Sequence, residues 1–105
     1  RRLARRAAIG LARTGSIAGN GSGDYVMAFS TARSCRIPQD SPGLTHTLEM
    51  VVEDGPIIDT LFQATVEATE EAILNAIFKA ETMIGRDGNV REALPLDRVG
   101  EVMWR

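Results

Sequence analysis

The fold class is decided by the stretch Gly19-Asn20-Gly21-Ser22-Gly23-Asp24, which runs directly into Tyr25-Val26-Met27-Ala28-Phe29-Ser30-Thr31. Three glycines alternate there with three small polar residues, on a backbone that can adopt positive φ and approach another group closely. The seven residues that follow are mostly apolar and rich in strand formers, which predicts a buried strand. Ser22 and Asp24 therefore place a hydroxyl and a carboxylate two residues apart at the mouth of a predicted strand.

The pattern of this loop leaves three interpretations open. It is a tight turn that feeds a strand, a phosphate-binding loop, or a catalytic loop in which Ser22 and Asp24 orient a nucleophile over the backbone of Gly21 and Gly23. A phosphate loop is disfavoured because the spacing matches neither G-x-x-x-x-G-K-[ST] nor G-x-G-x-x-G followed by a helix. Ser22 itself does not fit a nucleophile elbow, which needs a strand before the serine and a helix after it.

Apolar periodicity predicts a helix on each side of this loop. Residues 1–14 form an amphipathic helix, with an alanine and leucine stripe opposite the arginines and Gly15 as its C-cap. Residues 57–83 keep a helical period after a start marked by Asp54 and Pro56. One unbroken helix of that length would measure ~40 Å, so a break is expected at the β-branched residues 65–69.

The remaining elements complete an α+β pattern. Residues 45–52 are a second candidate strand, and Asp97 is the expected cap of a short last helix. The predicted order is helix, strand, strand, helix, helix, helix, which favours a sheet with helices against it. The predicted core consists of Leu3, Ala7, Leu11, Ile58, Phe62, Ile73 and Ile77.

Composition excludes several classes of protein. The 105 residues suit one domain, and the 44% hydrophobic and 25% charged content is ordinary for a soluble globular chain. No apolar run reaches the ~20 residues that span a bilayer, so no membrane association is expected. Cys35 and His46 are the only residues of their types, so neither an internal disulfide nor a metal site is expected, and the compartment is left open.

Charge is unevenly distributed along the chain. Five arginines lie within the first thirteen residues, whereas twelve of the fourteen acidic residues lie from Glu49 onward. The arginines form either a nucleic-acid-binding arm or a helix face that is solvated or pairs with the acidic half or another chain. No nucleic-acid partner is expected, because aromatic interleaving and a known binding module are both missing.

Long runs of the sequence resemble the β-subunit of the DmpA-type aminopeptidases. These are self-processing serine enzymes, also called L-aminopeptidase D-Ala-esterase/amidase, and the β-peptidyl aminopeptidases are their close relatives. The resemblance is carried by residues 2–15, 19–24 and 28–31, and it continues through 61–73, 85–88 and 93–97. It therefore covers nearly the whole chain.

The resemblance implies a fold, a reaction and partners. The chain would form part of an αββα sandwich that resembles the fold of N-terminal nucleophile hydrolases. A precursor cuts itself before a serine, which becomes the N-terminal nucleophile of the β-chain and is supported by Ser22 and Asp24. The α-chain supplies an asparagine to the oxyanion site, αβ pairs form homo-oligomers, the substrate is a peptide or amide, and no cofactor is required.

This sequence departs from the family pattern at its start. The nucleophilic serine and the strand it opens would lie just ahead of Arg1, so residues 1–105 are expected to be a single domain piece from the C-terminal portion of a β-chain. Alone it is expected to be inactive. Two alternatives stay open: a non-catalytic binding or assembly piece, and an enzyme like the ornithine acetyltransferases, which use a threonine nucleophile.

Overall fold

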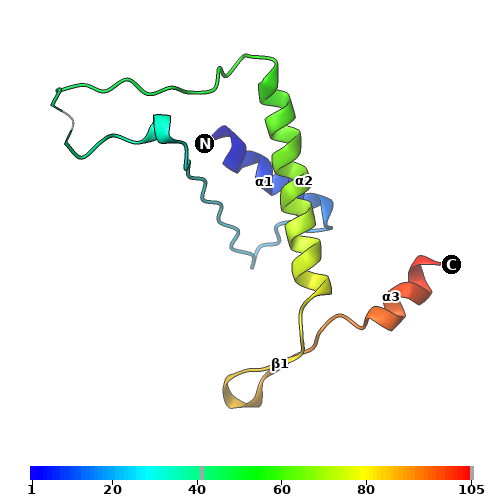
Figure 1. Cartoon of the computed structure of the whole chain (residues 1–105). Coiled ribbons are helices and arrows are strands. Elements are labelled where there is room, and N and C mark those ends of the chain that lie inside the picture. Colours follow the sequence, from blue (N-terminus) through cyan, green and yellow to red (C-terminus); the bar gives the residue numbers. More distant parts are fainter. Residues whose placement is uncertain (41, 105) are drawn as a thin grey trace.

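Two crossing helices organise the chain, and long extended segments connect them (Figure 1). The computed structural model describes residues 1–40 and 42–104. Helices and strands in this part of the chain are α1 (Arg2–Arg13), α2 (Ile57–Phe78), β1 (Met83–Ile84), β2 (Val90–Arg91) and α3 (Leu96–Met103), with short 3₁₀ turns at Arg33–Cys35 and Arg86–Gly88.

Helix α1 confirms the predicted first helix, with Thr14 and not Gly15 as its C-cap. Thr14 donates its hydroxyl to the carbonyl of Leu11 at 2.7 Å, and the next residue, Gly15, has a φ of +95°. A left-handed residue just past the last turn is a common way to end a helix, and glycine adopts that conformation without steric cost. The chain thereby turns away from the helix axis into the glycine-rich loop.

Helix α2 is a single continuous helix, so the predicted break at residues 65–69 is wrong. The two threonines there are accommodated because Thr65 donates its hydroxyl to Leu61 O and Thr69 to Thr65 O, each at 2.7 Å. The helix also ends at Phe78 and not at Met83. Its N-cap is Pro56, without a side-chain capping bond, so Asp54 does not cap it.

The contact between α1 and α2 is built on Gly10. Gly10 is buried, and a Cβ atom built on it would lie 2.6 Å from Val66 O and 2.8 Å from Thr69 Cβ. The helices therefore approach so closely that only glycine fits at the crossing, with Phe62 and Val66 buried beside it. Gly10 thus packs directly on the backbone of a second helix.

The predicted core is confirmed in part. Phe62 is buried, and four of the predicted residues are half-buried, namely Ala7, Leu11, Ile58 and Ile73. Leu3 and Ile77 are exposed, which corrects the prediction for those two positions.

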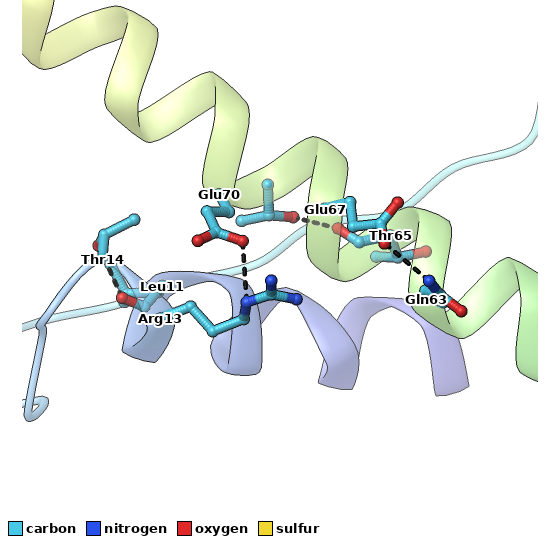
Figure 2. A network of polar contacts seen from close by, with 8 residues as sticks. Leu11, Arg13, Thr14, Gln63, Thr65, Glu67 and Glu70 are labelled. Atoms are coloured by element: carbon cyan, nitrogen blue, oxygen red, sulfur yellow. Dashed lines mark hydrogen bonds and ion pairs between the residues drawn. The ribbon is translucent and has the colours of Figure 1, made fainter.

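The arginines of α1 pair with the acidic half of the chain. Arg13 Nε lies 2.8 Å from Glu70 Oε2 on α2 (Figure 2), and Arg2 lies 3.5 Å from Glu53. Arg2 and Arg6 also place their guanidinium groups 5.0 and 4.0 Å from the centre of the Phe62 ring. The arginine face of α1 is thus partly an interface with α2, as one of the two interpretations of this cluster predicted.

The stacked arginine leads to a stability prediction. We expect Arg6→Met to lower the free energy of unfolding by about 0.5–1 kcal/mol, because it removes the guanidinium from the face of Phe62 but keeps an apolar stem. Arg5→Met is the matched control, because Arg5 is exposed. Chemical denaturation of the whole protein that contains this chain measures both. Equal effects of the two substitutions would contradict the stacking.

Neither predicted strand pairs within the described residues. Segments 25–31 and 45–52 are extended but hydrogen-bond to no neighbouring strand, so these two predictions are wrong for the chain as described. The physical reason is that a β-strand is stabilised by hydrogen bonds to a neighbouring strand, and the composition of a segment does not show whether such a neighbour is present. The sequence Ser41-Pro42-Gly43 predicts a turn, which lies partly outside the described residues.

The observed sheet is a small hairpin further along the chain. Strand β1 pairs antiparallel with β2, with Met83 opposite Arg91 and Ile84 opposite Val90. The connecting turn contains Asp87 and Gly88 at φ of 58° and 73°. This hairpin begins at Met83, the last residue of the helix predicted for residues 57–83. The described residues therefore hold three α-helices and one two-stranded sheet. This is the helix and strand content of an α+β chain, but the described helices do not pack on the sheet as layers.

Helix α3 lies apart from the α1–α2 pair (Figure 1). Its N-cap is Pro95, without a side-chain capping bond, so Asp97 sits in the first turn and does not cap it. The Cα radius of gyration is 20.0 Å, against the roughly 13 Å of a compact domain of this length. Most large apolar side chains are accordingly exposed, including Tyr25, Phe29 and Trp104.

Candidate active-site loop

The structure brings the two predicted site residues into direct contact. Ser22 donates its hydroxyl to Asp24 Oδ2 at 2.6 Å, a length typical of a hydroxyl that donates to a carboxylate. Both residues are exposed. An exposed serine and aspartate so arranged can accept a hydrogen bond from a neighbouring hydroxyl or amine and can orient a nucleophile.

A sharp change of direction after α1 positions this pair. Gly15 and Ala18 have φ of +95° and +48°, and Ser22 N donates to Gly19 O at 2.8 Å to close a turn at residues 20–21. These bends bring the chain back beside α1. Positive φ was expected among the alternating glycines, but the structure places it upstream, at Gly15 and Ala18.

The glycines of the loop keep space free around Ser22. A Cβ atom on Gly19 or Gly21 would meet no atom within 4 Å, and one on Gly23 would lie 3.5 Å from Tyr25 Cε2. The backbone on both sides of Ser22 is therefore open to a further group. The role of Gly21 and Gly23 as a backbone that another group approaches closely stays a prediction.

Asp24 also lines a mainly apolar groove of about 380 Å³ beside the two helices. One wall comes from the loop and the extended segment, through Gly23, Asp24, Tyr25 and Val26. The other wall comes from α1 and α2 and consists of Ala7, Ala8, Leu11, Thr69 and Ile73. Sequence reasoning assigned Ala7, Leu11 and Ile73 to the core and did not connect them with the site, since periodicity does not show which face of a helix lies beside a loop.

The other chemically notable residues lie outside this loop. Cys35 is exposed, and its contact is with the carbonyl of Glu49, at 3.7 Å, and not with His46. In residues 1–40 and 42–104, no group of three or more His, Cys, Asp or Glu side chains is arranged to hold a metal ion. No helix in the same part of the chain combines the length and apolar character needed to cross a bilayer.

The sequence matches a known family and named relatives. Residues 1–91 match the family described as peptidase family S58. The chain is 36% identical over 104 residues to the β-peptidyl aminopeptidase BapA of Sphingosinicella xenopeptidilytica, covering 97% of this chain and 25% of that protein. It is 40% identical over 95 residues to BapA of Sphingosinicella microcystinivorans, covering 90% and 23%. The chain thus spans about a quarter of the length of these curated relatives.

A solved structure has a similar arrangement. The PH0078 protein from Pyrococcus horikoshii OT3 superposes with a TM-score of 0.83 at 46% sequence identity. The match covers 99% of this chain and 28% of that one. The open course of the present chain, with its unpaired extended segments, therefore resembles a segment of a considerably longer polypeptide.

Proposed function

The chain belongs to peptidase family S58, the DmpA-type aminopeptidases, and on this premise we propose that it is part of a self-processing serine aminopeptidase. The enzyme releases N-terminal amino acids from short peptides, amides or esters through an acyl-enzyme. The observation that carries the proposal is the 2.6 Å hydrogen bond from Ser22 to Asp24, on a loop open to a further group.

In this proposal the nucleophile is a serine supplied by another part of the polypeptide. Autocatalytic cleavage makes that serine the N-terminus of a β-chain, of which residues 1–105 form the C-terminal portion. Its free α-amine, with a pKa of about 8, removes the proton from its own hydroxyl at neutral pH. The hydroxyl then attacks the substrate carbonyl, the amine or alcohol leaves, and water hydrolyses the acyl-enzyme.

Ser22 and Asp24 would support that nucleophile. Ser22 hydrogen-bonds the amine or hydroxyl of the N-terminal serine, and Asp24 holds the Ser22 hydroxyl in place. The carboxylate also stabilises the positive charge that develops when the amine takes the proton, as the aspartate does in a Ser-His-Asp triad. An asparagine of the α-chain would complete the oxyanion site.

The exposure pattern of segment 25–29 supports the proposed αββα sandwich. Tyr25, Met27 and Phe29 are 95%, 89% and 85% exposed, whereas Val26, between Tyr25 and Met27, is 50% exposed. Alternation with period two is the signature of a strand. Because both faces are apolar, this strand would lie between the helices and a second sheet.

The proposed partners follow from the same exposed surfaces. The unpaired extended segments and apolar faces would be covered by the α-chain and by the N-terminal part of the β-chain of the same precursor. Pairs of α- and β-chains would assemble into a homo-oligomer. Burial of the Tyr25, Met27 and Phe29 side chains supplies the hydrophobic free energy for this association.

Mass spectrometry of the mature whole protein tests this proposal. We expect two chains, and we expect the chain that contains residues 1–105 to begin with a serine that opens an apolar strand. A serine-directed acylating reagent should increase the mass of that chain by one acyl group. A threonine at this N-terminus would favour the ornithine acetyltransferase-like alternative, and a single uncleaved, unlabelled chain would favour a binding or assembly piece.

A further inference from the structure

Leu11 on α1 and Asp24 on the loop line the same groove. Leu11 is half-buried and lies in the last full turn of the helix, directly after Gly10. It comes from a different element than Ser22 and Asp24, which lie two residues apart on the loop. The side chain of Leu11 can therefore restrict the position of the loop that carries Asp24.

That surface is rigid for reasons visible in the helix crossing. Gly10 packs against the backbone of α2 at Val66, and Arg13 forms its 2.8 Å ion pair with Glu70 (Figure 2). Leu11 lies between these two attachments, so neither rotation nor sliding of α1 is free at this point. The half of the groove that faces Asp24 is thus held by α2 as well as by α1.

The chemistry of this wall favours the bond between Asp24 and Ser22. The groove-lining residues from the two helices are Ala7, Ala8, Leu11, Thr69 and Ile73, and none of them is ionisable. The only charged or titratable side chains on the groove are Asp24 itself and Tyr25 from the adjoining segment. This wall offers Asp24 no competing charged partner, and its one hydroxyl, that of Thr69, already donates to Thr65 O at 2.7 Å.

We propose that Leu11 is a positioning residue for the Ser22–Asp24 pair, a role that rests on the proposed function. Its side chain limits the orientations open to Asp24 and keeps the carboxylate directed at Ser22. The α1–α2 crossing thereby contributes to turnover as well as to folding. Leu11 touches neither the substrate nor the nucleophile in this role.

A double-mutant cycle in the whole, correctly processed protein tests the proposal. We expect Leu11→Ala to lower kcat about 10-fold with KM unchanged, since small misplacements of supporting groups reduce rates by such factors. Leu11→Met, which keeps the volume, should restore most of the rate. In an Asp24→Asn background, Leu11→Ala should have no further effect, because the group through which it acts is gone.

Leu3→Ala is the matched control, because Leu3 lies on the same stripe of α1 but does not line the groove. We expect it to leave kcat unchanged in both backgrounds. The proposal is overturned if Leu11→Ala behaves like Leu3→Ala, or if its loss of kcat is the same with and without Asp24. If Asp24→Asn and Ser22→Ala themselves leave kcat at the wild-type value, the proposed function fails instead.

Discussion

Replacing Ser22 by alanine, or Asp24 by asparagine, is expected to lower kcat by about 100-fold or more in the whole protein. Ser22→Ala removes the hydroxyl that donates to Asp24 at 2.6 Å, and Asp24→Asn removes the charge that holds this hydroxyl. Both substitutions are on an exposed loop, so the fold should be retained. Turnover of aminoacyl p-nitroanilides measures kcat, and a thermal melt checks the fold.

Ser16→Ala is a suitable control for these two variants. The Ser16 hydroxyl accepts a hydrogen bond from Ala18 N at 3.3 Å, and the residue lies in the same loop ahead of the glycine-rich stretch. Its kcat should stay near the wild-type value. Wild-type turnover in both Ser22→Ala and Asp24→Asn would show that the loop is a turn without a catalytic role.

The second large effect is expected at the helix crossing, where Gly10→Ala should destabilise the whole protein by about 1–3 kcal/mol. The new methyl group would lie 2.6 Å from Val66 O and 2.8 Å from Thr69 Cβ. Because the first of these atoms is backbone, the clash is relieved only by moving the two helices apart. That movement also weakens the contacts of Phe62 and the ion pair between Arg13 and Glu70.

Gly100→Ala separates this clash from the general effect of glycine in a helix. Gly100 lies within α3, and a Cβ atom there would meet nothing within 4 Å. Alanine is therefore expected to stabilise α3 by about 0.5–1 kcal/mol through its better helix propensity. Opposite signs of the two changes in unfolding free energy are the expected result. A neutral Gly10→Ala would contradict the close approach of α1 and α2.

Local features of the chain were predictable because their causes are local. The first helix, its ending just before Gly15, and the pairing of arginines with the acidic half follow from periodicity, glycine conformation and charge. The contact between Ser22 and Asp24 joins two residues that the sequence had singled out together. Their chemical role remains a prediction.

The errors have physical causes as well. The break expected at Thr65 and Thr69 is absent because their hydroxyls bond to carbonyls one turn earlier, a compensation that β-propensity does not include. Segments 25–31 and 45–52 have strand-like composition, but no described strand pairs with them, and composition alone does not supply a ladder partner. Predicted core residues Leu3 and Ile77 are exposed because amphipathicity identifies an apolar face without identifying what covers it.

The sequence by itself determined where α1 and α2 begin, and which hydroxyl and carboxylate share the loop. Long similar runs also determined the family, because such runs are far more specific than a short motif. Only the tertiary structure decided that Gly10 packs on the backbone of α2 and that Leu11 and Asp24 line the same groove. These contacts join residues distant in the chain, and they depend on the angle and rotation at which two helices cross, which no local pattern encodes.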